Sequence, residues 1–204
     1  MPVREHPSGK LKHVVREVLS KAWYTLYRYT YEYLRDDGRW DRQQREVYDR
    51  GNGAAVLLYD PDRHTVLLTR QFRMPTFVNG NPDGMLLEVC AGVLDGADPE
   101  ACIIREIFEE TGYRVPRVEK VLEAYSSPGA VTERMHLYLG AYNPGMKQGD
   151  GGGLPQESED IEVLEYTYET VLKMLRNGEI LDAKTLMLLQ YAALYGPLRD
   201  PAAQ

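Results

Sequence analysis

Aromatic and β-branched residues alternate with polar residues through much of the first third of the chain. Residues 23–34 have this period of two and are followed by the turn Asp36-Asp37-Gly38, so they predict a strand, and a second strand is expected around residues 45–48. Two apolar stretches at 54–59 and 65–73 flank Asp60-Pro61-Asp62 and predict a hairpin. Further short apolar segments predict strands at residues 85–90, 118–126, 135–142 and 161–167.

Three later segments carry helical signals. Asp98-Pro99-Glu100 supplies an N-cap, a proline at the first helical position and an acidic first turn, so we expect a helix from Pro99 to Thr111, ended by Gly112. Two closing helices are expected at residues 169–176 and 183–195. Between them and the first helix, residues 143–160 form a Gly-rich stretch around Gly151-Gly152-Gly153. A loop of that length is uncommon unless it is functional or disordered.

The composition narrows the function classes. The chain has 204 residues, 43% hydrophobic and 27% charged, which is typical of an ordinary soluble protein with one domain or one domain and a small appendage. Its net charge of −7 argues against a nucleic-acid partner but allows a small anionic substrate held by local arginines and a bound metal.

Targeting and cysteine usage favour a cytoplasmic protein. No apolar run approaches the roughly 20 residues that span a bilayer, so no membrane partner is expected. The first residues, MPVREHPSGKLKH, lack the apolar segment of a signal peptide. Cys90 and Cys102 have no metal-ligand spacing, and two cysteines in a chain of this size fit a reducing compartment.

The helix from Pro99 to Thr111 has an unusual polar face. Its helical periodicity places Ile104, Ile107, Phe108 and Thr111 on one stripe, which we expect to be core, and Arg105, Glu106, Glu109 and Glu110 on the opposite side. A solvated face is the ordinary explanation. However, Glu106 and Glu110 repel each other at i, i+4, and glutamates near a helix C-terminus oppose the macrodipole. A divalent cation removes both costs. The helix alone leaves both interpretations open.

A family resemblance decides between them. Residues 92–113, GVLDGADPEACIIREIFEETGY, resemble the Nudix box, G-x5-E-x7-R-E-U-x-E-E-x-G-U with U aliphatic. The matching positions are Gly92, Arg105, Glu106, Ile107, Glu109, Glu110 and Gly112. Asp98 replaces the first glutamate, and its spacing to Arg105 is one residue short. Both departures lie at the helix entry, where Asp98 is better explained as a cap, and the carboxylate cluster is intact.

The similarity extends over roughly residues 19–191. The segments REVYDRGNGA, RQFR, CAG, EETGY, SPGAVTE and GGG…EDIEVLE resemble the GDP-mannose pyrophosphatase branch of the Nudix superfamily, with the ADP-ribose pyrophosphatases as its nearest sibling group. The resemblance implies an α/β fold, a Nudix α/β/α sandwich with an N-terminal antiparallel β-sheet segment. We expect that segment at residues 1–50, packed on or exchanged with the partner of a homodimer, the Nudix hydrolase domain at 51–197, and a tail at 198–204.

The resemblance also implies a reaction and a metal site. It implies hydrolysis of the pyrophosphate bond of a nucleoside diphosphate sugar, GDP-mannose first, with Mg²⁺ as cofactor and Mn²⁺ as a substitute. The implied metal ligands are the Ala91 backbone oxygen, Glu106, Glu110 and Glu159. The implied catalytic residues begin with Glu159, as a metal ligand or the general base, with Glu157 as its alternative. Glu109 is either a further ligand or a residue that contacts the ligands. Arg105 orients the glutamates.

Substrate contacts follow from the same resemblance. Arg73 matches a phosphate-binding arginine, and the segment Gln44, Arg45 and Glu46 matches a nucleotide-binding stretch that can reach the partner subunit's site. Trp23 or Tyr24 could stack on the base, and the remaining implied contacts are Gly92, Val93, Glu133, Ser158 and Lys184. Packing is an equally supported role for Gln44, Glu46 and Trp23. ADP-ribose is the alternative substrate, and a nucleotide sensor without activity is the alternative of another class, disfavoured because a sensor has no reason to keep a costly acidic cluster.

Overall fold

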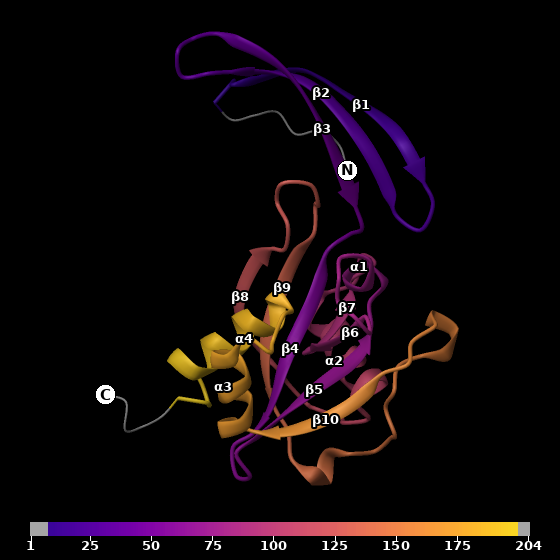
Figure 1. Ribbon diagram of the computed structural model, residues 1–204, viewed down its shortest axis with the longest axis vertical. Helices are drawn as coiled ribbons and strands as arrows, with labels where there is room; N and C mark the ends of the chain where they lie inside the picture. The colour runs from indigo at the N-terminus through magenta and orange to yellow at the C-terminus, as the bar shows by residue number, and fades with distance from the viewer. Residues whose placement is uncertain (1–7, 200–204) are drawn as a thin grey trace. The chain divides into compact units, whose positions relative to one another are not determined.

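The structure is a computed structural model that describes residues 8–199 (Figure 1). Its described residues form two compact units. The first comprises the chain up to Gly51 together with Tyr125–Glu133, and the second comprises Asn52–Ala124 and the chain from Arg134 onward. The expected tail at 198–204 falls mostly outside the described residues. No helix among the described residues is long and apolar enough to cross a bilayer.

The first unit is built on a three-stranded antiparallel sheet in the order β1-β2-β3. Its strands are β1 (Leu11–Lys21), β2 (Thr25–Leu34) and β3 (Trp40–Asp49). β1 was not predicted from the sequence. Its pairing with β2 shifts register twice, between Lys12 and Val15 and between Val18 and Ser20, which breaks the period of two. None of residues 8–50 is fully buried, so this sheet has no core of its own.

The second unit contains a mixed sheet in the order β10-β5-β4-β9-β8, with β6 paired to β5 and β7 to β4. β4 runs parallel to β9 and antiparallel to β5, so the predicted hairpin is confirmed. The predicted strand at 85–90 is two strands, because the pairing passes from β5 to β4 at Val89. The strands are β4 (Gly53–Asp60), β5 (Thr65–Phe72), β6 (Met85–Glu88), β7 (Cys90–Val93), β8 (Glu119–Tyr125), β9 (Arg134–Ala141) and β10 (Glu162–Thr167).

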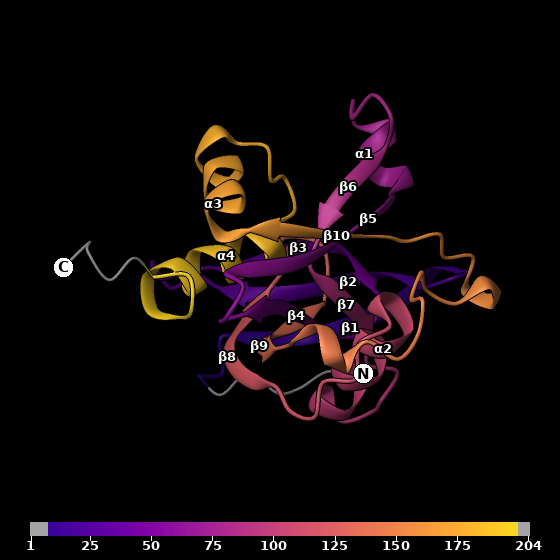
Figure 2. The same ribbon diagram turned by 90° about the horizontal axis from the view of Figure 1, so that it is seen from below.

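Helices cover both faces of this sheet, which confirms the α/β/α sandwich (Figure 2). One core joins Val56 and Leu58 of β4 to α2 (Pro99–Thr111). The other joins Ala55 and Leu57 to α3 (Tyr168–Asn177) and α4 (Ala183–Tyr195). β4 is apolar at almost every position because its alternate side chains enter different cores. The short elements are α1 (Met74–Val78), η1 (Pro144–Met146) and η2 (Pro155–Glu157).

The helix α2 begins and ends as predicted, but its buried face only partly matches the predicted stripe. The Asp98 side chain accepts hydrogen bonds from the backbone nitrogens of Glu100 and Ala101, and Gly112 ends the helix at φ 77°. The buried residues are Cys102, Ile103, Ile107, Glu110 and Thr111. The prediction that Glu110 lies opposite the core is therefore wrong. Cys102 and Ile103 had been left out of the apolar stripe, and including them turns the buried face toward Glu110.

Candidate active site

Glu106 and Glu110 lie one helical turn apart on α2, beside the strand β7. A Cβ atom at Gly92 of β7 would lie 2.5 Å from Glu106 Oε1, so only glycine lets this carboxylate approach the strand backbone. The neighbouring Ala91 pairs with Ala55 of the central strand β4, which fixes its backbone position. Gly92 thus brings a helix carboxylate and the strand bearing the Ala91 carbonyl together.

Glu110 is a buried carboxylate that forms no ion pair with a cationic side chain in the described part of the chain. It is 2% exposed, and its Oε2 has no hydrogen-bond partner among the described residues. Burial raises the pKa of Glu110 to about 8; a hydrogen bond with the Cys90 thiol opposes this shift, and the charges of Glu159, Glu106 and Glu88 add to it. An ionised carboxylate in such a position is costly until a cation neutralises it. Its environment is therefore suited to a bound cation.

Arg105 contacts both of the other helix carboxylates. Its Nη2 donates to Glu106 Oε1 at 2.7 Å, and its Nε lies 3.5 Å from Glu109 Oε2. Burial raises the pKa of Glu106 even though Arg105 lowers it. Arg105 is more than half exposed, so it orients these two carboxylates from the solvent side of the helix.

The Gly-rich segment 148–153 is docked on the last turn of α2. The backbone nitrogen of Gly152 donates to the Glu110 carbonyl at 2.8 Å, and that of Gly153 donates to the Glu109 carbonyl at 3.1 Å. A Cβ at Gly151 would lie 2.5 Å from the Glu110 carbonyl oxygen. These glycines therefore allow close approach and satisfy helix carbonyls that would otherwise lack partners.

This docked segment leads to Glu159. The Glu159 carboxylate accepts a hydrogen bond from the Leu154 backbone nitrogen at 3.0 Å, and a Cβ at Gly153 would lie 2.5 Å from Glu159 Oε2. The negative charge of Glu159 is among the causes that raise the pKa of Glu106 and Glu110. Ser158 adopts a left-handed conformation at φ 59°. The Glu157 side chain lies outside the described part of the structure.

The donor atoms around Glu110 suit a hard divalent cation. Glu106, Glu110 and the Ala91 carbonyl offer oxygen ligands, and the buried Glu110 Oε2 has no competing partner among the described residues. Within residues 8–199, no group of three or more His, Cys, Asp or Glu side chains forms a ready-made metal site. Backbone, substrate and water oxygens would therefore complete the coordination, as is common for Mg²⁺.

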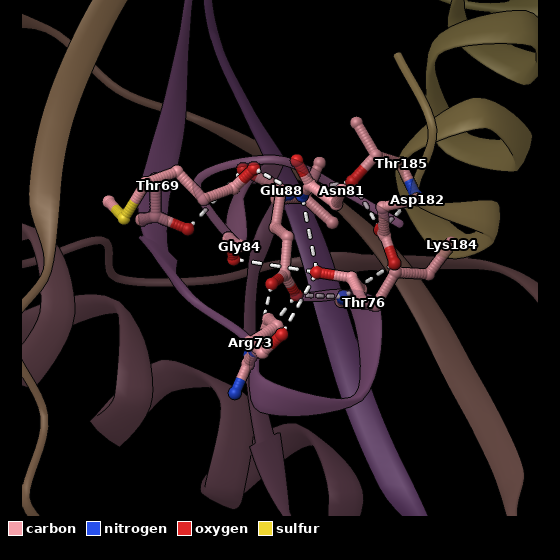
Figure 3. Close-up of polar contacts among 11 residues, drawn as sticks. Thr69, Arg73, Thr76, Asn81, Gly84, Glu88, Asp182, Lys184 and Thr185 are labelled. Atoms are coloured by element: carbon pink, nitrogen blue, oxygen red, sulfur yellow. Dashed lines mark hydrogen bonds and ion pairs between the residues drawn. The ribbon is translucent and has the colours of Figure 1, made fainter. Parts of the chain in front are cut away.

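A second buried carboxylate, Glu88 at the end of β6, lies among cationic side chains (Figure 3). It is 2% exposed and accepts from Arg73 Nε at 2.6 Å and Nη2 at 3.1 Å, and from Lys184 Nζ. Lys184 also pairs with Asp182 at 3.0 Å. Arg73 and Lys184 had been predicted as substrate contacts, and the structure places both on one carboxylate. The sequence interpretation missed Glu88, although an acidic residue ending an apolar strand was a usable signal.

The other predicted substrate contacts are divided between the two units. Gly92 and Val93 belong to β7, whereas the first unit carries Trp23, Gln44, Arg45, Glu46 and Glu133. Trp23 is 83% exposed, and Gln44 Nε2 donates to Thr30 Oγ1 at 3.1 Å. Glu133 is buried and accepts from Ser126 Oγ at 2.8 Å, with Arg50 Nη1 at 3.3 Å. Exposure leaves Trp23 available for stacking, while Glu133 is already paired within its unit.

Comparison with known proteins covers nearly all of the described chain. Residues 10–48 match the family model for the GDP-mannose pyrophosphatase NudK N-terminal domain, and residues 49–188 match the NUDIX domain. The chain is 52% identical over 192 residues to a GDP-mannose pyrophosphatase of Yersinia enterocolitica, covering 94% of this chain and 100% of that protein. It is 50% identical over 189 residues to a GDP-mannose pyrophosphatase of Pectobacterium atrosepticum, covering 93% and 97%.

Proposed function

The chain belongs to the Nudix hydrolase family, and on this basis we propose that it hydrolyses the pyrophosphate bond of GDP-mannose to GMP and mannose 1-phosphate. The observation that supports this substrate is the match of residues 10–48 to the GDP-mannose pyrophosphatase NudK N-terminal domain. The catalytic helix alone would support any pyrophosphatase of the family. Identity near 50% over both units extends the likeness to the whole chain.

The cofactor that we propose is Mg²⁺, with Mn²⁺ as a substitute. Glu106, Glu110 and the Ala91 backbone oxygen would hold it, and Glu159 would either join them as a ligand or act as the general base. When bound, the cation neutralises charge that the phosphate oxygens carry during attack by water. Two observations support this assignment: Glu110 Oε2 is buried with no hydrogen-bond partner in residues 8–199, and the pKa of its carboxyl is raised.

The chain's own residues then have separate tasks. Glu159 acts as the general base that takes a proton from the attacking water, because it stands on a segment docked at the metal helix; Glu157 is the alternative. Arg105 holds Glu106 and Glu109 in place. Arg73 and Lys184 bind phosphate oxygens, for which a guanidinium fork is well shaped. Gly92, Val93 and Ser158 would line the path of the diphosphate.

The first unit serves dimerisation and base recognition in this proposal. Its sheet has no buried residue among 8–50, and Val15 and Val18 are 62% and 54% exposed. A twofold partner would cover this apolar surface. Gln44, Arg45 and Glu46 lie together on β3, where they could contact the nucleotide of the partner's site, and Trp23 could stack on the base. Both described cysteines are free, which supports a cytoplasmic location.

A turnover panel tests the proposed substrate. Purified protein with Mg²⁺ is given GDP-mannose, other nucleoside diphosphate sugars or ADP-ribose at equal concentration, and the nucleotide products are separated by chromatography. We expect GDP-mannose to give the highest kcat/KM, with GMP as product. Preference for ADP-ribose with release of AMP would instead show that the protein is an ADP-ribose pyrophosphatase. Binding without turnover of any compound would instead support a nucleotide sensor.

A further inference from the structure

Glu88 has no role in the mechanism above, yet it is among the most buried side chains in the described chain. Three cationic nitrogens surround its two oxygens: Arg73 Nε on Oε1, and Arg73 Nη2 and Lys184 Nζ on Oε2. These neighbours lower the pKa of Glu88, although burial would raise it, so the carboxylate is ionised. A charge this deeply buried is retained only where its partners are held in excellent geometry.

The pairing fixes the direction of the Arg73 guanidinium. Two of its three nitrogens are bound to Glu88, and Figure 3 shows a guanidinium nitrogen of Arg73 pointing away from that carboxylate. The Arg73 side chain is 41% exposed, whereas that of Lys184 is 15% exposed. The outward edge of Arg73 is therefore the accessible cationic surface of this cluster.

The cluster is anchored to α4. Asp182 pairs with Lys184 and caps the helix through Thr185, whose hydroxyl accepts from the Val89 backbone nitrogen at 2.8 Å. Asp182, Lys184, Glu88 and Arg73 thus form a continuous chain of ion pairs from the start of α4 to the end of β5. Formally the four charges cancel, so the cluster supplies orientation rather than an excess of positive charge.

The same cluster is close enough to the carboxylates of α2 for their charges to interact. The charge of Glu110 acts on Arg73, and that of Glu88 acts on Glu110. Glu88 of β6 lies two residues before Cys90 of β7, and the charge of Glu110 is among the causes that raise the pKa of Cys90. A phosphate held at the α2 carboxylates by a cation would therefore be near the free edge of Arg73.

We propose that Glu88 is a positioning residue, which holds Arg73 in one orientation so that its free edge receives a phosphate of the diphosphate substrate. This inference rests on the proposed function. Without the Glu88 charge, the Arg73 side chain would sample several solvent-exposed orientations. It would then lose conformational entropy when substrate binds, which weakens binding. A contact made equally in ground and transition states affects KM and leaves kcat largely unchanged.

The test compares Glu88→Gln, Arg73→Gln and the double variant by initial-rate kinetics with GDP-mannose. We expect Glu88→Gln to raise KM about tenfold and to change kcat less than about threefold. Because Glu88 acts through Arg73, the double variant should be no worse than Arg73→Gln. Additive losses, or an unchanged KM with only a lower melting temperature, would overturn the proposal.

The matched control is Glu165→Gln, which breaks another bidentate pair, with Arg63 Nη1 and Nη2 at 2.6 Å each. Glu165 lies on β10 and has no contact with the Glu88 cluster among the described residues. This variant should leave KM unchanged, so a rise in KM there would show that Glu88→Gln reports general loosening. If Glu88→Gln does not fold, Glu88→Asp takes its place. That shorter carboxylate keeps the charge but cannot reach all three nitrogens, and an unchanged KM would contradict the proposal.

The outcome for the wild type separates the two proposals. A wild-type protein that leaves GDP-mannose intact contradicts the proposed function, and the comparison is then made on the compound that the panel identifies. An active wild type with Glu88→Gln kinetics equal to its own contradicts only the role of Glu88.

Discussion

Replacing Glu110 by glutamine should stabilise the metal-free protein while abolishing its activity. The substitution keeps the side-chain shape and removes an ionisable carboxyl that is 2% exposed and whose Oε2 has no hydrogen-bond partner among the described residues. The i, i+4 repulsion from Glu106, about 0.3 kcal/mol, is only a minor part of the cost of ionising Glu110. Desolvation of the carboxylate is therefore the larger effect.

The magnitude follows from the pKa of Glu110, which burial raises from the ordinary 4.5 to about 8. Between those two values the folded state retains a proton that the unfolded state has lost, so folding stability falls as pH rises. At pH 7 the solution is about 2.5 pH units above the ordinary pKa. At about 1.36 kcal/mol for each unit, the loss of folding stability caused by Glu110 is at most roughly 3 kcal/mol. Allowing for relaxation, we expect about 1–3 kcal/mol, or a rise in Tm of roughly 3–10 °C.

The assay is thermal unfolding of both proteins in EDTA at pH 5.5 and pH 8. The advantage of Glu110→Gln in Tm should grow with pH, because the glutamine does not titrate. Adding Mg²⁺ should raise the Tm of the wild type more than that of the variant, since binding to the folded state stabilises it. Equal melting temperatures of the two proteins at both pH values, or a variant less stable than the wild type at pH 8, would refute the claim that ionised Glu110 destabilises the metal-free protein.

Three further predictions concern the Gly-rich segment and the first unit. Glu159→Gln should lower kcat by orders of magnitude and lower the free energy of unfolding by less than about 0.5 kcal/mol. Glu157→Gln should lower kcat less, and Ser158→Ala least. A larger loss of kcat in Glu157→Gln than in Glu159→Gln would identify Glu157 as the general base. Gly151→Ala should lower both Tm and kcat because its Cβ would meet the Glu110 carbonyl. The control Gly178→Ala has the same φ of 74° but nothing within 4 Å of its Cβ, so it should lower Tm by the backbone strain and leave kcat unchanged. Equal losses of kcat in the two variants would contradict the docking of the Gly-rich segment on α2. Sedimentation velocity should give a dimer near twice 23.3 kDa, and a fully active monomer would withdraw Gln44, Arg45 and Glu46 as contacts to a partner's site.

The boundaries of α2 could be predicted because their signals are local. Asp98 and Gly112 act within a few residues of the helix ends, and the structure places both as expected. The buried face was only partly predicted, because the stripe left out Cys102 and Ile103 and placed Glu110 on the opposite side. Glu110 occupies a core position that periodicity assigns to an aliphatic side chain.

Contacts over long sequence separations were beyond the sequence pattern. Glu88 meets Lys184 across 96 positions, so nothing local indicates that the two converge. The Gly-rich composition of residues 143–160 predicted a long loop, functional or disordered, whereas the structure gives Gly151, Gly152 and Gly153 close contacts with α2 and a left-handed backbone. β1 was missed because a sheet without its own core exerts little selection for an apolar face.

Phosphorus NMR of GDP-mannose incubated with the protein tests the central claim most directly. With Mg²⁺, the two coupled diphosphate resonances should disappear as two monophosphate resonances, those of GMP and mannose 1-phosphate, grow in equal amount. With excess EDTA the spectrum should not change, and restoring Mg²⁺ should restart the reaction. Formation of GDP and free mannose, or undiminished cleavage in EDTA, would contradict a metal-dependent attack on the pyrophosphate bond.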